Sequence, residues 1–307
     1  MSARHATPLQ ALLFDEGFDG DVYPNEPMAR HTTYRIGGPA RFFVQVGSIG
    51  ALTKLIEACQ DSSVPWLVVG RGSNLLVADV GYDGVVIALG RDFRNCRFDS
   101  ERSCFCVGAG FSLSSLVQEA YTRNLAGLEF AVGTPGSVGG ALRMNAGSRD
   151  RWLGQQVQSV TVYEEGVGLR RLLKEDLAWG YRQSSFTPEQ VLLECEIAVE
   201  PADPVYIRSK MDGSLARRRR TQPLGLPSCG SVFRNPEGAS AGELIEQLGL
   251  KGLTRGGAQV STVHSNFIVN TGNATAQDVF DLICAVRIKV SQAYGIELQP
   301  EVRFVGF

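Results

Sequence analysis

Histidine is scarce in this sequence, and its cysteines follow no recognisable pattern. The 307 residues include three histidines, at positions 5, 31 and 264, and seven cysteines. No CxxC pair is present and no histidine lies at ligand spacing from a cysteine, so we expect no metal site. An odd number of cysteines without fixed spacing is typical of reduced, buried thiols in a reducing compartment.

Long hydrophobic runs and a strong charge of one sign are also missing. No apolar run approaches the roughly 18 residues that a membrane helix needs, and residues 1–20 lack the hydrophobic region of a signal peptide. The formal net charge of −2 gives no general attraction to nucleic acid or acidic membranes. We therefore expect a cytoplasmic protein with no membrane insertion and no nucleic-acid partner.

Several common catalytic and nucleotide-binding motifs are absent. Residues 70–75 would match GxGxxG only if Leu75 were glycine, which disfavours a Rossmann fold, and no GxxxxGK[ST] P-loop is present. The chain has no GxSxG elbow and few histidines to act as a base, so serine hydrolase chemistry is disfavoured.

Glycine is abundant instead, and it is concentrated in two segments. The segment Ala131–Gly147 (AVGTPGSVGGALRMNAG) is dense in glycine and nearly free of charge, and GRGSNLLV (70–77) follows the apolar run WLVV. Glycine lets backbone N–H groups approach a phosphate closely. Two tight turns without a ligand are the alternative, but together the segments favour an extended, nucleotide-like cofactor.

The length of 307 residues allows about two domains, and the hydrophobic pattern predicts both helices and strands. Residues 41–46 and 66–69 read as strands flanking an amphipathic helix at 51–60, and strands at 84–89 and 104–110 precede a helix at 113–121. Alternating runs at 157–163 and 191–197 indicate antiparallel strands. A charged helix and boundary lie within 201–227. Beyond it, capping boxes at Ser240 and Thr275 begin two helices, with strands at 267–270 and at the C-terminus.

Three polar residues in these segments are candidates for chemistry. Ser231 lies in the loop PSCGSVFRNP, Arg182 in GYRQSSF, and Glu301 in LQPEVRF, where partial burial would raise the pKa of its carboxyl group. Turn formation and surface ion pairing are the commoner uses of such residues. The basic run Arg217–Arg220 is interpreted as cations at the C-terminal end of a helix.

The segments together closely resemble a known family. HTTYRIGGPARF, GRGSNLLV, GLEFAVGTPGSVGGALRMNAG, GYRQSSF, QPLGLPSCGSVFRNP, GLKGLTRGGAQVSTVHSNFIVN and LQPEVRF occur in the same order in UDP-N-acetylenolpyruvoylglucosamine reductases, the MurB family. The resemblance covers nearly the whole chain. Because the chain is short and lacks the extra substrate-covering insertion, it resembles the compact subtype.

The resemblance implies a fold and a division into domains. The expected fold is the FAD-binding fold of the vanillyl-alcohol-oxidase type in two subdomains, with a separate α+β substrate-binding domain. We assign the FAD-binding domain to 1–203, with subdomains of about 1–88 and 89–203. A helix and linker at 204–220, the substrate-binding domain at 221–299 and a C-terminal strand at 300–307 returning to the active site complete the assignment.

The resemblance also implies an activity. FAD takes hydride from NADPH and passes it to the enolpyruvyl group of UDP-N-acetylglucosamine enolpyruvate, which yields UDP-N-acetylmuramate for peptidoglycan synthesis. Arg182 would stabilise the developing charge on the substrate carboxylate, a protonated Glu301 would donate to the same charge, and Ser231 would deliver the proton. These three residues are expected to converge above the flavin.

The remaining assignments concern binding. Tyr34, where relatives often have Phe, is expected to pack on the cofactor. The other expected FAD contacts are Gly70, Arg71, Gly72, Ser73, Asn74, Leu75, Gly133, Thr134, Pro135, Ser137, Val138, Gly139, Gly140, Asn145, Ala146 and Gly147. Arg234, Asn235 and Glu246 are expected to bind substrate. His264 and Asn266 belong either to the core or to the cleft.

Two other functions remain open at this point. One is an FAD-dependent oxidase of another small alcohol or sugar, although PSCGSVFRNP and QPEVRF disfavour it. The other is a non-catalytic module that binds a nucleotide sugar or nucleic acid through Arg217–Arg220, which the near-neutral charge disfavours. We expect a monomer or a weak dimer.

Overall fold

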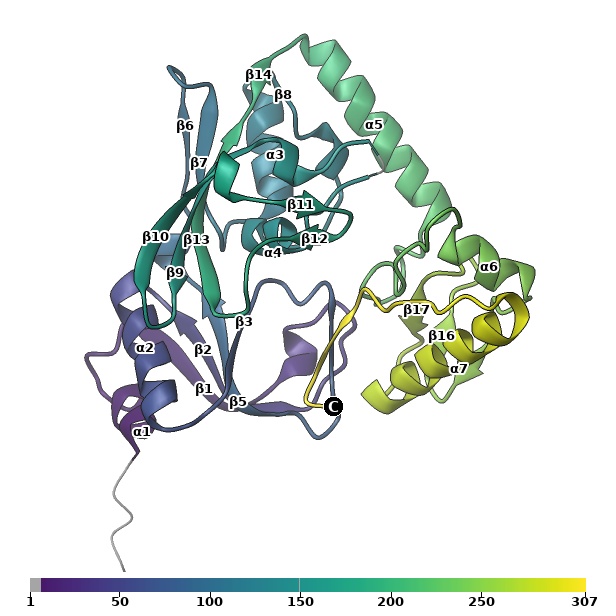
Figure 1. Cartoon of the computed structure of the whole chain (residues 1–307), viewed down its shortest axis with the longest axis horizontal. Helices are drawn as coiled ribbons and strands as arrows, with labels where there is room; N and C mark the ends of the chain where they lie inside the picture. The colour runs from purple at the N-terminus through teal and green to yellow at the C-terminus, as the bar shows by residue number, and fades with distance from the viewer. Residues whose placement is uncertain (1–6, 149) are drawn as a thin grey trace, which may run out of the picture. The chain divides into compact units, whose positions relative to one another are not determined.

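The computed structural model describes residues 7–148 and 150–307, and by internal packing these form two compact units (Figure 1). Unit 1 comprises residues up to 24, 41–70 and 83–215, and unit 2 comprises 25–40, 71–82 and 216–307. Two short N-terminal segments therefore pack with the C-terminal part of the chain. The predicted functional domains do not coincide with these units, and that assignment stays a prediction.

The first sheet of unit 1 confirms the predicted strand, helix and strand at 41–69. Its order is β1-β2-β5-β3, with β3 parallel to β5, so β5 lies between the two predicted strands. Helix α2 begins after Ser48, whose side chain accepts a hydrogen bond from Ala51 N, and it buries its apolar face. The elements are α1 (Pro8–Leu13), β1 (Gly20–Pro27), β2 (Pro39–Val46), α2 (Ile49–Asp61), β3 (Trp66–Val69) and β5 (Tyr82–Leu89).

The second sheet of unit 1 has five strands in the order β10-β9-β13-β7-β6. The predicted antiparallel pairing of 157–163 with 191–197 is confirmed by β9 and β13. Figure 1 shows these long strands together with β10. The elements are β6 (Cys96–Asp99), β7 (Cys104–Gly108), α3 (Leu113–Thr122), β8 (Leu125–Ala126), α4 (Val138–Arg143), β9 (Val157–Glu164), β10 (Gly168–Leu173), β11 (Trp179–Gly180), β12 (Gln183–Ser184), β13 (Gln190–Ala198) and β14 (Glu200–Pro201).

Unit 2 has its own hydrophobic core, formed by helices on a small antiparallel sheet, β15-β16-β17. Strand β18 pairs in parallel with β4, which links the C-terminus to the segment after the first glycine loop. The elements are β4 (Leu75–Val77), α6 (Ala241–Gln247), β15 (Thr254–Arg255), β16 (Ala258–Val260), β17 (Ile268–Asn270), α7 (Ala276–Tyr294) and β18 (Arg303–Val305).

The predicted helices of the C-terminal region are confirmed. Ser240 and Thr275 are the N-caps of α6 and α7, and Thr275 forms the full capping box with Asp278. The carboxylate of Asp79 also accepts hydrogen bonds from Ala276 N and Gln277 N, at 2.8 and 3.0 Å. The first three N–H groups of the helix, those of residues 276–278, therefore all have side-chain acceptors, which explains why α7 begins sharply.

The charged helix predicted in 201–227 is α5 (Pro204–Thr221). Its last turn carries Arg218, Arg219 and Arg220, where cations complement the helix dipole as predicted. The boundary between the two units falls inside this helix, between Leu215 and Ala216. Within the described residues, no helix is both long and apolar enough to cross a membrane.

Candidate active site

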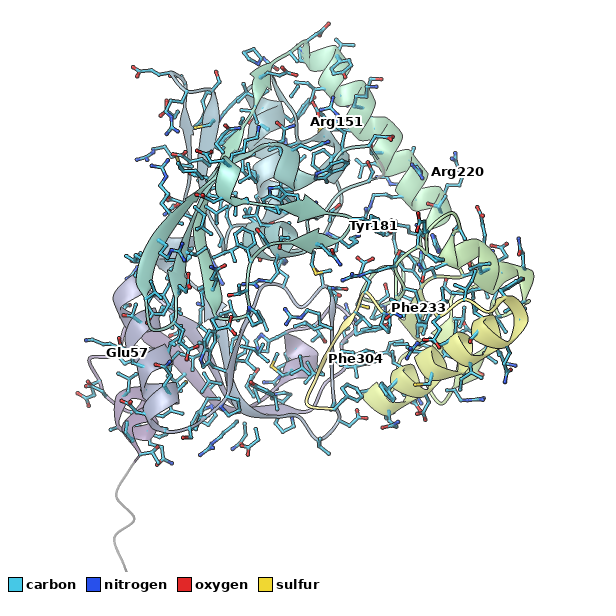
Figure 2. The ribbon with its side chains drawn as sticks, viewed as in Figure 1. Glu57, Arg151, Tyr181, Arg220, Phe233 and Phe304 are labelled. Carbon is cyan, nitrogen blue, oxygen red and sulfur yellow. The ribbon has the colours of Figure 1, made fainter. Side chains whose placement is uncertain are left out.

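Arg182 lies at the turn of the short hairpin β11–β12. Gly180 pairs with Gln183, which leaves Tyr181 and Arg182 as the two turn residues, and Figure 2 labels Tyr181 at this end of the hairpin. Arg182 has φ of +55°, a left-handed conformation that costs a residue other than glycine roughly 1 kcal/mol. Backbone strain of this kind is often retained where it serves function.

Three side chains attach this hairpin to the end of the second glycine segment. Arg182 Nη1 donates to Gly147 O at 2.9 Å, and Asn145 Nδ2 donates to Gly180 O at 2.8 Å. Ser184 Oγ donates to Arg143 O at 2.8 Å. The sequence analysis did not identify Ser184. The only signal for it in the sequence is its position two residues after Arg182. The position of Arg182 therefore depends on residues 143–147.

The glycines of the second segment are explained mainly by close packing. A Cβ on Gly139 would overlap Ala109, and one on Gly147 would overlap the backbone of Arg151. The N–H groups of Val138 and Gly139 already donate to Phe111 O and Ala109 O, and that of Gly140 donates to Ser137 Oγ. The segment contains the short helix α4 rather than a continuous loop.

The predicted contacts of this segment differ in accessibility. Ser137 and Asn145 are 5% and 3% exposed, and Asn145 also accepts a hydrogen bond from Gly154 N at 3.0 Å. Both side chains therefore serve the local fold, and a direct bond from either to a cofactor stays a prediction that this burial does not favour. Seven other predicted contacts in this segment are exposed or partly exposed, namely Gly133, Thr134, Pro135, Gly139, Gly140, Ala146 and Gly147.

The first glycine loop, in contrast, has backbone donors to spare. Among the described residues, the N–H groups of Arg71 and Gly72 have no hydrogen-bond acceptor. Gly72 has φ of +59° and its missing Cβ leaves room for His31 O, so glycine is required there. Unused N–H groups beside an accessible arginine fit the phosphates of FAD.

The first glycine loop is bonded directly to the segment that carries Glu301. Asn74 Nδ2 donates to Glu301 O at 2.9 Å, and Asn74 O accepts from Arg303 N at 3.0 Å. Glu301 N in turn donates to Val232 O at 2.7 Å, next to Ser231. Unit 2 therefore brings Ser231, Glu301 and Asn74 together, although they are far apart in sequence.

The environment of Ser231 suits a proton donor. Gly230 has φ of +83°, which turns the chain immediately before the serine. The Ser231 hydroxyl is partly exposed and makes no hydrogen bond within the described part of the chain. Two residues earlier, burial raises the pKa of the Cys229 thiol to about 12, so this cysteine stays protonated and unreactive.

The three predicted substrate residues are used differently. Arg234 Nε is buried without an acceptor among the described residues, which leaves it available for an anionic ligand. Asn235 Oδ1 accepts from Ala241 N at 3.0 Å and so caps α6. Glu246 is exposed and pairs with Lys251 at 2.7 Å. Substrate contacts by Asn235 and Glu246 stay predictions that these bonds do not support.

Tyr34 is fully buried in the core of unit 2. Its side chain is 0% exposed and packs in the same cluster as Cys229 and Phe233, with its hydroxyl near the Cys229 thiol. Burial raises the pKa of Tyr34 well above its usual value. The predicted contact of this ring with the cofactor stays a prediction, and the complete burial does not favour it.

The structure assigns Asn266 to the core and leaves His264 at its margin. Asn266 is 5% exposed, and both polar atoms of its side chain bond to the backbone of Phe233. His264 Nδ1 accepts from Asn266 N at 3.2 Å, its ring packs on Phe267, and burial lowers its pKa.

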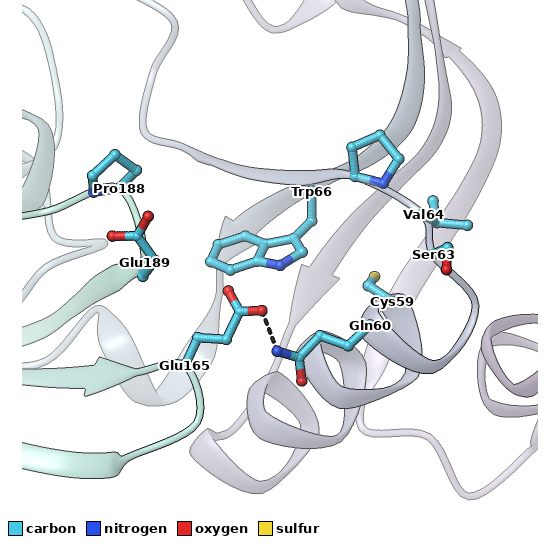
Figure 3. Close-up of a pocket in the computed structure, with 9 residues that line it drawn as sticks. Cys59, Gln60, Ser63, Val64, Trp66, Glu165, Pro188 and Glu189 are labelled. Carbon is cyan, nitrogen blue, oxygen red and sulfur yellow. Dashed lines mark hydrogen bonds between the residues drawn. The ribbon is translucent and has the colours of Figure 1, made fainter.

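A pocket of 490 Å³ in unit 1 is lined by none of the predicted site residues (Figure 3). It is lined by Trp66, by the hydrogen-bonded pair Gln60 and Glu165, and by Pro188 and Glu189. The nearby Cys59 thiol is buried and burial raises its pKa to about 12, so it offers no nucleophile. The chemistry of this pocket does not match any candidate function.

Comparison with known proteins decides the family. The sequence profile described as the C-terminal domain of UDP-N-acetylenolpyruvoylglucosamine reductase matches residues 222–305, and that of an FAD binding domain matches 40–168. The UDP-N-acetylenolpyruvoylglucosamine reductase of Heliobacterium modesticaldum is 46% identical over 94% of this chain and 92% of that protein. That of Halalkalibacterium halodurans is 42% identical over 94% of this chain and 95% of that protein. The chain belongs to the UDP-N-acetylenolpyruvoylglucosamine reductase family.

A solved structure of this family confirms the predicted fold class. The MurB crystal structure from Thermus caldophilus has a TM-score of 0.80 and 34% identity, and the match covers 93% of this chain and 98% of that one. The fold is α+β, with an FAD-binding fold of the vanillyl-alcohol-oxidase type and a C-terminal domain characteristic of the family. The protein is an FAD-dependent oxidoreductase of the MurB family.

Proposed function

We propose that the protein reduces UDP-N-acetylglucosamine enolpyruvate to UDP-N-acetylmuramate, with NADPH as electron donor, in cytoplasmic peptidoglycan precursor synthesis. The observation that carries this proposal is the 46% identity, over 94% of the chain, to a reductase named for this substrate. The described residues support it through the unused backbone donors at Arg71 and Gly72 and the buried, unpartnered Nε of Arg234.

The reduction needs charge stabilisation, because an enol ether is electron-rich and resists hydride. Bound FAD, once reduced by NADPH, would supply the hydride to the terminal vinyl carbon. Arg182 is proposed to hold the substrate carboxylate, since a guanidinium keeps its charge and can donate two parallel hydrogen bonds. Its bond to Gly147 O restricts the side chain before substrate arrives, so less orientation is needed during the reaction.

Ser231 and Glu301 are proposed to act on the proton side of the reaction. The Ser231 hydroxyl, which makes no hydrogen bond within the described residues, would donate the proton to the carbon next to the carboxylate. Glu301 in its protonated form would donate a hydrogen bond to the negative charge that develops on the carboxylate. The main-chain bond between Glu301 N and Val232 O supports this pairing of roles.

Arg234 is proposed to bind the pyrophosphate of the UDP group. A buried guanidinium N–H without an acceptor costs stability unless a ligand completes it. A diphosphate offers oxygen acceptors of the required charge. The role of Arg234 is thus separate from that of Arg182, which acts at the reacting end of the substrate.

The test separates the two half-reactions by stopped-flow spectroscopy. The purified protein should be yellow, its flavin absorbance should bleach with NADPH, and the enolpyruvyl substrate should restore it. Exchange of Ser231→Ala should slow the restoration at least about 10²-fold while bleaching stays within about twofold. Glu246→Gln, an exposed carboxylate in the same unit, tests whether that residue matters at all.

Two outcomes would contradict the proposal. A colourless protein that binds no added FAD would contradict the assignment of FAD as cofactor. Equal slowing of both half-reactions by Ser231→Ala would contradict the role of Ser231 as proton donor. Fast reoxidation by oxygen, with no need for nicotinamide, would instead identify an oxidase of another alcohol or sugar.

A further inference from the structure

Asn266 bonds to the main chain of the segment that follows Ser231, much as a neighbouring strand would. Its Oδ1 accepts from Phe233 N at 2.9 Å, and its Nδ2 donates to Phe233 O at 2.8 Å. Its own carbonyl accepts from Val232 N at 2.8 Å. One asparagine therefore satisfies three of the four main-chain polar groups of Val232 and Phe233.

The fourth group leads to Glu301. The carbonyl of Val232 accepts from Glu301 N at 2.7 Å, and Phe233 forms an isolated antiparallel bridge with Pro300. Figure 2 labels Phe233 beside the C-terminal segment. Val232 thus lies between Asn266 on one side and Glu301 on the other, and it directly follows Ser231. A displacement at Asn266 would move the backbone that carries both residues.

The side chain of Asn266 is itself too buried to bind a ligand. It is 5% exposed, and both polar atoms are already used. An apolar side chain of similar size would fill the space but leave Phe233 N and O without partners, which is costly in a buried position. The amide is therefore needed for its donor and its acceptor together.

We propose that Asn266 is a positioning residue that sets the Ser231 hydroxyl relative to the Glu301 carboxyl group. The proposal rests on the proposed function, in which these two groups act on one substrate. Catalytic groups must be held to within about 0.5 Å of their productive geometry, and a displacement of about 1 Å can cost about 10²-fold in rate. Asn266 provides this restraint without touching the substrate.

The experiment uses Asn266→Asp, in which the hydrogen bond donated to Phe233 O depends on pH. A protonated aspartic acid has one acceptor oxygen and one O–H donor, so it can reproduce both bonds to Phe233. The ionised form cannot donate, and it places a negative charge against the Phe233 carbonyl. Burial favours the protonated form, which moves the change in behaviour toward neutral pH.

Both half-reactions are measured for the full-length, FAD-loaded enzyme at pH 5.5 and pH 8, each relative to wild type at the same pH. We expect restoration of flavin absorbance by substrate to be at least about tenfold slower at pH 8 and within about threefold of wild type at pH 5.5. Bleaching by NADPH should stay within about twofold at both pH values. The substrate Kd, read from the perturbed flavin spectrum, should change little because Asn266 does not contact the ligand.

A control variant and a pH-jump protocol keep the result interpretable. Asn273→Asp adds the same charge at an exposed asparagine of unit 2 and should leave both half-reactions unchanged. If Asn266→Asp unfolds at pH 8, it is prepared at pH 5.5 and jumped to pH 8 in the stopped-flow instrument, so that rates are read before unfolding.

The outcomes distinguish this inference from the proposed function. Parallel slowing of both half-reactions, no slowing at all, or a loss that does not change with pH would overturn the role of Asn266. A wild-type protein that NADPH bleaches but that the enolpyruvyl substrate does not reoxidise would overturn the proposed function instead.

Discussion

The two units hold their candidate catalytic residues by different means. In unit 1, Arg182 lies in a two-residue turn with a left-handed φ, attached by three side-chain bonds to residues 143–147. In unit 2, Ser231 and Glu301 lie on extended segments bonded through main-chain groups and through Asn266. What the two arrangements share is a buried asparagine, Asn145 in unit 1 and Asn266 in unit 2, which bonds main-chain groups where pairing between strands is short.

The largest expected effect comes from Arg182→Gly. This change removes the charge and the contacts with Gly147 O and the Tyr181 ring, but it permits the left-handed φ, so relief of about 1 kcal/mol of backbone strain should offset much of the loss. Urea unfolding should shift by less than about 1 kcal/mol. Reoxidation of the reduced flavin by substrate should slow by about 10²- to 10³-fold.

Arg97→Gln is the control for Arg182→Gly, since it removes an exposed arginine from β6 of the same unit. It should leave rates and stability unchanged. If Arg182→Gly unfolds as easily as a core variant, the hairpin depends on the arginine rather than on the bonds made by Asn145 and Ser184.

A smaller effect is expected from Asn145→Ala. The variant loses the bonds to Gly180 O and Gly154 N and places alanine at a φ of +43°, so we expect destabilisation of about 2–4 kcal/mol by urea unfolding. Asn145→Gly loses the same bonds but accepts the φ, and it should be about 1 kcal/mol more stable than the alanine variant. Equal stability of the two would show that the backbone carries no strain there.

The smallest expected effect is on stability and comes from a charged residue, Glu196, whose contribution depends on pH. The contribution of a neutral asparagine does not. Glu196 on β13 accepts hydrogen bonds from Arg102, Ser159 and Arg171, and these bonds, chiefly the one from Arg102, lower the pKa of its carboxyl group to about 2. Because the folded pKa lies below the unfolded value of about 4.3, the pair stabilises the fold above about pH 4. This contribution is lost as the pH falls toward 2.

Glu196→Gln should therefore cost about 1 kcal/mol at pH 7, after discounting for the exposed arginines, and nothing near pH 2. Urea unfolding at several pH values measures the difference. The penalty of Asn145→Gly should be the same across this range. A pH-dependent penalty at Asn145, or a constant one at Glu196, would break the distinction between neutral and charged restraints.

Several predictions from the sequence were confirmed for local reasons. The caps at Ser240 and Thr275 and the arginines at the end of α5 depend on neighbours within one or two turns of helix. The glycines at 131–147 were identified correctly as a special segment, but the reason was incomplete. The N–H groups of Gly139 and Gly140 bond within the protein, and close packing against Ala109 and Arg151 leaves no room for a side chain at Gly139 or Gly147.

The roles of Tyr34, Asn145 and Asn235 could not be judged from the sequence. Each is a polar residue in a segment rich in site residues, yet the structure uses the polar side chains of Asn145 and Asn235 for bonds to backbone and buries Tyr34 completely. Such bonds join positions up to 35 residues apart, as between Asn145 and Gly180. A local sequence pattern does not show which residues so far apart in the chain form hydrogen bonds with each other.

The sequence by itself determined the five longer helices of the described residues, fewer than half of their strands, the glycine segments and, through its ordered motifs, the family. These depend on short-range periodicity, capping and composition, which can be read from adjacent residues. Only the tertiary structure decided that Ser231, Glu301 and Asn74 meet in one unit, and that the side chains of Asn145 and Asn266 bond to main-chain groups far away in sequence. Those outcomes arise when chain segments far apart in sequence satisfy each other's buried main-chain polar groups, and this requirement has no local signature.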